Sequence, residues 1–309
     1  MDKLVSVFIP CYNSEFFLPK LFDSLLNQTH KKIEVIAVDD GSTDGSQNVF
    51  DAYTSKFKAS GINFIVIKQV NSGQAVAINK ALKVFKGDYL TWIDSDDWLD
   101  LDALRAKVEF LENNENFGFV RTDVAMYKYP DYKKVIGLFS DTRDFKNTNI
   151  FLDLILEKNV YFCPGGYLVK REALLDVLPD KHIIESRAGQ NWQLLLPLAK
   201  KYKCGYINKP LFSYLVRDSS HSHSVVDLEE KINRCKVHRN LILDVIRSLG
   251  LDIKYYEALL DKKYENTIIS LCYKYRNLPE LKQQFKKFKV NSLKSYCRLF
   301  VLSIKNILS

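Results

Sequence analysis

The sequence lacks the cysteine patterns that hold small secreted proteins or structural zinc sites together. Its six cysteines are scattered and include no C-x-x-C pair, which disfavours both kinds of site and favours free, buried thiols in a reducing compartment. No apolar run approaches the ~20 residues of a membrane span. A strand-like segment begins directly after Lys3, without a secretory signal pattern. We therefore expect a cytosolic protein.

Net charge is absent from most of the chain. Residues 1–226 carry equal numbers of acidic and basic side chains, whereas residues 227–309 carry 17 Lys and Arg against 9 Asp and Glu, so the whole net charge of +8 lies in the last quarter. Such a basic tail is typical of binding to nucleic acid or to an anionic membrane, or of a solvated helix face. No nucleic-acid recognition motif accompanies it, so we expect no nucleic-acid partner.

The first hundred residues alternate between strand-like and helix-like patterns. Short β-branched or aromatic runs occupy residues 4–10, 33–40, 62–68 and 88–94, and helical patterns occupy 19–26, 44–60 and 74–85. Pro19 suits the first turn of a helix, and Ser42 or Thr43 is a candidate cap for the second helix. This order predicts a doubly wound, mostly parallel α/β sheet.

The rhythm changes after residue 98. Residues 99–226 mix strands and helices, with separate strands expected at 204–208 and 211–217, and we expect this half to join the same sheet. Residues 227–309 read as helices only, beginning at an Asp227 capping box and continuing over 253–276, 279–289 and 292–308. The predicted regions are therefore 1–98, 99–226 and 227–309.

Acidic and small residues gather where three predicted parallel strands end. Ligands of open α/β sheets bind at this edge. Carboxylates collected there repel one another unless a cation or hydrogen-bond donors compensate. Hard cations such as Mg²⁺ or Mn²⁺ take oxygen ligands, typically one or two carboxylates plus substrate phosphates. The carboxylates are Asp39, Asp40, Asp44, Asp94, Asp96 and Asp97.

Three motifs at these strand ends resemble the signature of family 2 glycosyltransferases: PCYN at 10–13, VDDGSTD at 38–44 and DSDDW at 94–98. The resemblance covers roughly residues 4–225 and implies the GT-A fold. A segment at 163–173 is similar to one in bacterial members that build polysaccharides. The implied activity is inverting transfer of a hexose or N-acetylhexosamine from a nucleotide sugar, with Mn²⁺ or Mg²⁺. The implied acceptor is a hydroxyl of a glycan, lipid-linked or protein-linked.

The resemblance also implies residue roles. Pro10 and Tyr12 frame the nucleotide base, Asp40 hydrogen-bonds it in a way that favours uracil, Asp94 lies near the ribose, and Asp96 binds the metal. Relatives often carry an Arg where this chain has Ile78, which removes one expected donor contact. The full set expected to bind the donor is Pro10, Tyr12, Asn13, Asp39, Asp40, Asn71, Asp94, Ser95 and Arg217.

The catalytic base is the point at which the sequence departs from the family. An inverting transfer needs a base for the acceptor hydroxyl, and many relatives carry Glu-Asp before a Trp. Here the same place reads Gln190-Asn191-Trp192, and neither amide accepts a proton at neutral pH. Glu185 and Asp97 are the nearest candidate bases. Alternatively, Asn191 orients the acceptor, or the chain is a catalytically silent module that binds sugar or nucleotide.

Two late segments complete the expectations. In the polar loop after Arg217, His221 is the candidate second metal ligand. Residues 293–308 place apolar side chains at helical spacing among Lys and Arg, which suits a helix that packs on the protein or on a second subunit of a homodimer, or one that lies on an anionic membrane at the inner face. A sugar-phosphate nucleotidyltransferase is the rival enzyme, but it needs a Gly-rich basic loop that residues 10–15 lack.

Overall fold

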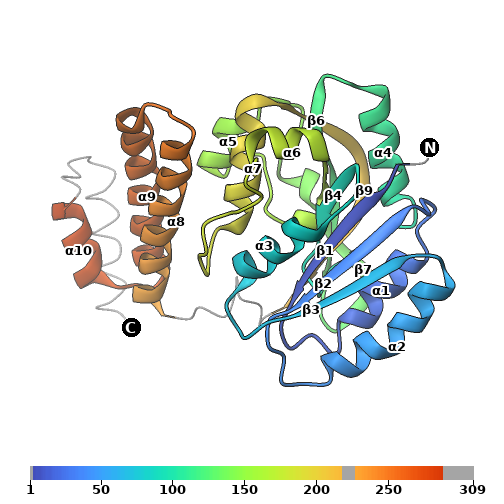
Figure 1. The fold of residues 1–309 in the computed structure, drawn as a ribbon. Coiled ribbons are helices and arrows are strands. Elements are labelled where there is room, and N and C mark those ends of the chain that lie inside the picture. Colours follow the sequence, from blue (N-terminus) through green and yellow to red (C-terminus); the bar gives the residue numbers. More distant parts are fainter. Residues whose placement is uncertain (1–2, 218–226, 288–309) are drawn as a thin grey trace. The chain divides into compact units, whose positions relative to one another are not determined.

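The computed structural model describes residues 3–217 and 227–287. The chain forms two compact units, Met1–Arg217 and Asp218–Ser309 (Figure 1). The first unit contains both predicted halves of the α/β region, and one sheet runs through them.

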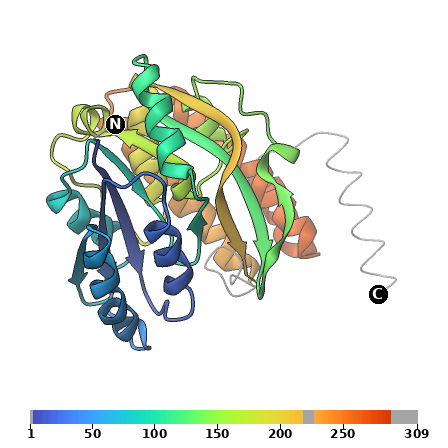
Figure 2. The ribbon, with the colours of Figure 1, turned by 90° about the vertical axis from the view of Figure 1, so that its right-hand side faces the viewer.

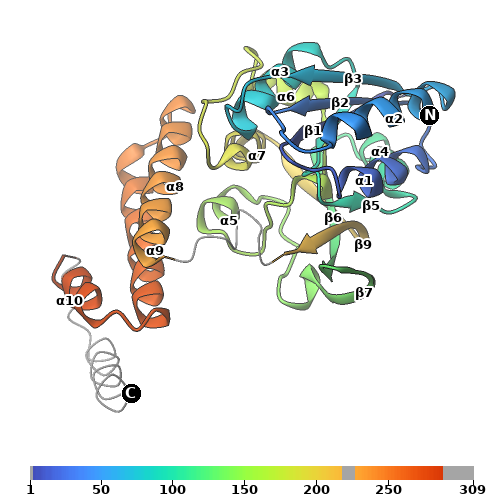
Figure 3. The same cartoon turned by 90° about the horizontal axis from the view of Figure 1, so that it is seen from below.

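The first half of the sheet is parallel. Its strands are β1 (Val5–Cys11), β2 (Ile33–Asp39), β3 (Asn63–Lys68) and β4 (Tyr89–Trp92), in the spatial order β3-β2-β1-β4. Every residue of β1 and β2 is buried, because helices cover both faces. Figure 3 shows α1 (Leu18–Leu26) and α2 (Ser46–Ala59) against one face and α3 (Gln74–Val84) against the other. The predicted doubly wound arrangement is confirmed.

In the second half the sheet becomes mixed, with both parallel and antiparallel strands, and it curls. β8 (Tyr167–Lys170) is antiparallel to β4, and β6 (Phe117–Lys128) and β9 (Lys203–Val216) follow as long parallel neighbours. In Figure 2 they lie side by side, with β7 (Asp131–Leu138) on the edge of β6. The short β5 (Trp98–Leu99) pairs with β9, and the Leu99 N–H donates to Ser24 Oγ of α1 at 3.3 Å. The end of the sheet thereby returns to the first helix.

Helices of the second half pack around this sheet. They are α4 (Ala103–Asn113), α5 (Phe151–Leu156), α6 (Arg171–Val177) and α7 (Gln190–Lys201). Helix α4 carries Lys107, which is fully buried and donates from Nζ to the Gly165 carbonyl at 2.6 Å. Burial lowers the pKa of Lys107 to about 7.

The second unit consists of helices over the part that the structure describes. These are α8 (Leu228–Ser248), α9 (Ile253–Lys274) and α10 (Leu278–Lys287). Asp227 caps α8 by accepting from the Glu229 N–H at 3.3 Å, and Arg239 ties α8 to α9 through Glu257 and Asp261. None of the described helices is both long and apolar enough to cross a membrane. The helix expected at 292–308 lies outside the described residues.

Two local expectations were wrong, and two short elements were missed. Neither Ser42 nor Thr43 caps α2; its N-cap residue is Gly45, and the Ser46 N–H donates to Oδ1 of the preceding Asp44 at 3.0 Å. The strands expected at 204–208 and 211–217 are one strand, β9, which bends through register shifts against β6. The short β5 and α6 were not anticipated, because two and seven residues are too few to show a period. The described cysteines are free thiols, as expected, and all but the half-buried Cys163 are buried.

Candidate functional site

The three motif-bearing strand ends meet at one edge of the sheet. Cys11 at the end of β1 pairs with Asp39 at the end of β2, and the Asp40 N–H donates to the Cys11 carbonyl at 2.8 Å. On the other side of β1, the Ile93 N–H donates to the Phe8 carbonyl. β2 and β4 lie on opposite sides of β1, so the order in which strands are added to the sheet reverses here. This is the place where open α/β sheets bind ligands.

Hydrogen bonds join the loops after β1 and β2. Asn13 has a φ of 49°; its N–H donates to Ser42 Oγ at 2.9 Å, and its Oδ1 accepts from the Thr43 N–H at 2.8 Å. The Ser42 N–H in turn donates to Asp39 Oδ1 at 2.9 Å. Asn13 therefore joins the loops that follow β1 and β2, and Asp39 holds Ser42 in place at the rim of the site.

Asp40 holds the loop that follows β3. Its Oδ1 accepts from Gln69 Nε2 at 2.8 Å and from the Ser72 N–H at 2.6 Å, and its Oδ2 accepts from the Gly73 N–H at 2.8 Å. The side chain is buried. Gly41 is required beside it, because its φ is +77° and an added Cβ would lie 2.9 Å from the Asn71 backbone nitrogen.

Two groups next to this loop are open to a ligand. The Tyr12 side chain is 44% exposed, whereas Pro10 beneath it is buried, so the ring presents a face for stacking. Asn71 is half-buried and accepts from Arg187 Nη1 at 3.3 Å. Ile78 is buried in α3, so it packs in the core and makes no polar contact at the site.

The DSDDW segment follows β4 directly. Asp94 Oδ1 accepts from Gln74 Nε2 at 3.1 Å; burial, followed by the nearby Asp96 carboxylate, raises the pKa of Asp94 to about 7. Ser95 Oγ is 2.7 Å from Ser14 Oγ. The excess of negative charge at this point favours binding of a cation.

Asp96 forms an ion pair with Arg217, the first residue after β9. The Nε and Nη2 atoms of Arg217 lie 2.9 and 2.5 Å from Asp96 Oδ2, and the two side chains are 22% and 16% exposed. The guanidinium also lies over the Phe17 ring, 4.4 Å from its centroid. The predicted metal ligand and the predicted donor contact are therefore bonded to each other.

Asp97 faces inward. It is 1% exposed, and its Oδ1 accepts from the Leu215 N–H of β9 at 2.9 Å. Its Oδ2 is buried without a hydrogen-bond partner. Burial, followed by the charges of Asp96 and Asp94, raises the pKa of Asp97. This geometry anchors β9 and leaves no open path to an acceptor hydroxyl.

Asn191 is buried at the start of α7. Its Oδ1 accepts from Trp92 Nε1 at 2.7 Å and its Nδ2 donates to the Phe162 carbonyl at 2.7 Å. Both ends of the amide are thereby engaged with the protein. The neighbouring Gln190 turns outward and donates to Gln74 Oε1.

Glu185 is exposed in a loop that two buried amides hold in place. Asn79 of α3 exchanges two hydrogen bonds with the Ile183 backbone, at 2.8 and 2.9 Å. Gln193 of α7 does the same with Ile184, at 2.6 and 2.9 Å. The backbone before Glu185 is therefore rigidly positioned, while the carboxylate itself is accessible.

The residues present fit a divalent ion that is held partly by its substrate. Asp96 would offer a hard oxygen ligand of the kind that Mn²⁺ and Mg²⁺ take, in a region made more negative by Asp94. Within residues 3–217 and 227–287, no group of three or more His, Cys, Asp or Glu is arranged as a metal cage. His221 lies outside the described residues.

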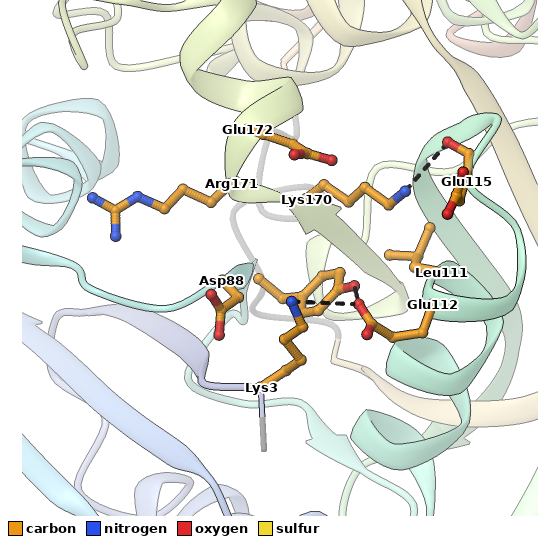
Figure 4. A pocket seen from close by; sticks show the side chains of 9 residues that line it. Lys3, Asp88, Leu111, Glu112, Glu115, Lys170, Arg171 and Glu172 are labelled. Carbon is orange, nitrogen blue, oxygen red and sulfur yellow. Dashed lines mark hydrogen bonds and ion pairs between the residues drawn. The ribbon is translucent and has the colours of Figure 1, made fainter. Parts of the chain in front are cut away.

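A separate polar pocket of about 520 Å³ lies at the opposite end of β1 and β4 (Figure 4). It contains no residue of the three motifs. Carboxylates and cations alternate around it, and Tyr89 donates to Glu112 within it. Its lining is Lys3, Asp88, Tyr89, Leu111, Glu112, Glu115, Lys170, Arg171 and Glu172.

Several polar residues that shape the site were not singled out from the sequence. They hold the loops rather than supply charge, and no pattern in the sequence distinguishes them from surface amides. Gln74 begins the helical pattern expected at 74–85, but its bond to Asp94 was not foreseen. The others are Gln69, Ser72, Asn79, Arg187 and Gln193.

Comparison with known proteins settles the family. The sequence model described as Glycosyl transferase family 2 matches residues 6–178, more than half of the chain. The chain belongs to glycosyltransferase family 2. Solved structures with the GT-A fold resemble it: S. aureus TarS in complex with UDP-GlcNAc has a TM-score of 0.59 at 21% identity, over 97% of this chain and 79% of that chain. The fold of the first unit is therefore GT-A, as predicted.

Other similar proteins differ in how much of their length aligns with this chain. "Glycosyltransferase GlyG" of Streptococcus pneumoniae is 27% identical over 87% of this chain and 90% of its own length. "Poly(ribitol-phosphate) beta-glucosyltransferase" of Bacillus spizizenii is 37% identical over 55% of this chain but only 25% of its own length. "Mannosyltransferase PcManGT" of Pyrobaculum calidifontis, in complex with GDP-Man and Mn²⁺, has a TM-score of 0.59 at 18% identity, over 99% of this chain and 88% of that chain. The chain spans a third or less of some longer relatives.

Proposed function

We propose that the chain transfers a sugar from a nucleotide-sugar donor, a UDP-sugar, to an acceptor hydroxyl. The observation that carries the proposal is the convergence of the exposed Tyr12 ring, the Asp40-held loop and the Asp94–Asp96 carboxylates at the β1/β4 switch point. Their order along the edge matches a base, a ribose and a diphosphate. UDP-GlcNAc bound to S. aureus TarS supports the choice of donor.

The donor is bound by side chains and backbone together. Tyr12 stacks on the base over Pro10, and the loop carried by Asp40 closes the base pocket, with Asn13, Asp39 and Asn71 on its rim. Asp94 and Ser95 lie beside the ribose, and Arg217 receives the diphosphate.

The proposed cofactor is Mn²⁺ or Mg²⁺, held by Asp96 and the donor diphosphate, with His221 as a further candidate ligand. When bound, such an ion neutralises charge that develops on the leaving nucleotide. The protein's own residues orient the donor so that the face of the sugar opposite the nucleotide is open to the acceptor. Attack on that face inverts the anomeric centre.

Glu185 is the proposed catalytic base, because it is an accessible carboxylate on a backbone that Asn79 and Gln193 hold. Asp97 is a positioning residue for β9, and Asn191 positions Trp92 and Phe162. A silent binding module is the second candidate function, since both ends of the Asn191 amide are engaged where many relatives carry a carboxylate.

The proposed acceptor is a hydroxyl of a glycan, which is lipid-linked or protein-linked. The proposed transferred group is a hexosyl or N-acetylhexosaminyl residue. Release of free nucleotide from UDP-, GDP- and dTDP-sugars with Mn²⁺ and candidate acceptors tests the function. Asp96→Ala is expected to abolish release, whereas Asp100→Ala, at an exposed neighbour, retains it. Nucleotide binding by the unaltered protein without any release would instead indicate the silent module.

A further inference from the structure

Arg217 and Asp96 are held together from two sides. Two nitrogens of the guanidinium, Nε and Nη2, converge on Oδ2 of Asp96, and the Phe17 ring covers the guanidinium 4.4 Å away. Tyr129 packs edge-on against Phe17, with 6.0 Å between ring centroids. The pair is mostly shielded from water, with 22% and 16% of the side chains exposed, so its attraction is stronger than that of a surface pair.

This arrangement sets two cations in competition for one carboxylate. A guanidinium 2.5 Å from Oδ2 neutralises much of the charge that would attract a divalent ion to Asp96. A diphosphate changes the balance, because its oxygens offer the planar guanidinium of Arg217 a doubly charged partner for bidentate hydrogen bonds. Among the described residues, Arg217 has no second ion-pair partner that could take it from Asp96 instead.

We propose that Arg217 is a resident counter-cation that keeps metal affinity low until the donor arrives, and then passes from Asp96 to the donor diphosphate. The inference rests on the proposed function, and it adds an order to it: metal and diphosphate bind together, and neither binds well alone. The handover breaks one ion pair and forms another, with no proton or covalent bond transferred. Linkage requires that the metal and the nucleotide strengthen each other's binding by the same factor.

The test is the Mn²⁺ affinity of the full chain without nucleotide, measured by electron paramagnetic resonance of free Mn²⁺. Arg217→Gln is expected to tighten donor-free Mn²⁺ binding by about tenfold, within the usual range of coupling between sites. Added UDP should then improve Mn²⁺ binding much less in this variant than in the unaltered protein. Arg217→Lys, which keeps the charge but loses the forked geometry, should fall between the two.

Lys20→Gln is the matched control, because it removes a nearby positive charge that does not bond Asp96. The Lys20 amine lies over the Trp98 ring, 4.2 Å from its centroid. Lys20→Gln should change the donor-free Mn²⁺ affinity by less than about twofold if direct contact with Asp96, rather than a distant positive charge, lowers that affinity. Equal affinities for Arg217→Gln and the unaltered chain would overturn the handover while leaving the proposed function intact. Failure of the unaltered chain to bind Mn²⁺ even with UDP would overturn both.

Discussion

The indole nitrogen of Trp92 donates a 2.7 Å hydrogen bond to Oδ1 of Asn191, a residue 99 positions later in the chain. The other end of the same amide donates to the Phe162 carbonyl. A carboxylate could accept the first bond but not donate the second. The amide is therefore the residue type that this buried position requires.

Asn191→Asp is expected to destabilise the protein without raising the transfer rate. The new carboxylate would face the Phe162 carbonyl, so its pKa in the folded state should lie above the unfolded value. Stability is then lost as pH rises through that folded pKa. We expect a loss of ~1–3 kcal/mol at pH 8, and a smaller loss at pH 5, in urea denaturation. Gln190→Glu, at an outward-facing amide, is the control. A faster enzyme would contradict the prediction.

Glu185→Gln is expected to lower the transfer rate by ~10²–10⁴-fold, the span of general-base catalysis. UDP affinity should barely change, because the proposed role of Glu185 is toward the acceptor hydroxyl and not the donor. Steady-state rates and calorimetric UDP titration separate the two effects. Asp180→Asn, at an exposed carboxylate just before the same loop, should be neutral. A near-normal rate for Glu185→Gln would rule out this base.

Asp40→Asn is expected to weaken UDP binding by about tenfold or more, which is about 1.4 kcal/mol. The amide can accept on one side only, so the bond from Ser72 or from Gly73 is lost and the loop moves. Ser72→Ala is the control, because the Ser72 bond to Asp40 comes from its backbone N–H. Calorimetry on both variants measures the difference. Unchanged affinity in Asp40→Asn would show that the loop takes no part in donor binding.

Lys107→Met is expected to flatten the pH dependence of stability. The pKa of Lys107 is about 7 when folded and near 10.5 when exposed, so the unfolded chain binds more protons between these values. Wild-type stability therefore gains ~1.4 kcal/mol per pH unit from this group over that window, and loses it as pH falls toward 7. In urea denaturation, the free energy of unfolding of Lys107→Met relative to wild type should therefore fall from pH 7 to pH 9.5. Lys83→Met, at an exposed site, should show no such trend.

The basic tail gives a prediction for membranes. Each Lys or Arg near an anionic leaflet contributes ~1 kcal/mol, and salt weakens the attraction. The full chain should sediment with anionic vesicles more than with neutral ones. Replacing Lys294, Arg298 and Lys305 together with Gln should reduce the difference. Equal sedimentation with both vesicle types would leave packing on the protein or on a second copy as the role of this segment.

The parallel half of the fold was readable because burial on both faces leaves an unambiguous signature. The runs that became β1 and β2 are nearly all apolar, and a motif marks the end of each strand. The second half was less readable. The strands expected at 204–208 and 211–217 left out Lys209 and Pro210, whereas β9 runs through both. Its register against β6 shifts between Ile207 and Pro210.

The structure brings several candidate site residues to one edge of the sheet, but the sequence did not predict the bonds between them. Asp96 and Arg217 were each named as candidates, yet their ion pair depends on how β9 returns to β5, beside the DSDDW segment, across 121 residues. Asp97 belongs to the same DSDDW motif as Asp96, and the sequence does not show that its side chain, unlike that of Asp96, is buried in the core. Alternation along an irregular turn decides which carboxylate faces the ligand, and local sequence does not encode it.

The continuity of β9 limits where this chain can tolerate changes in length. Phe212 and Ser213 pair with β5, Leu215 is fixed to Asp97, and Arg217 follows within two residues. An extended residue adds ~3.3 Å and turns the next side chain to the opposite face. A single insertion or deletion between Ser213 and Arg217 would therefore displace the guanidinium while every motif remained intact. We expect natural length variation to fall before Lys203 or after Arg217.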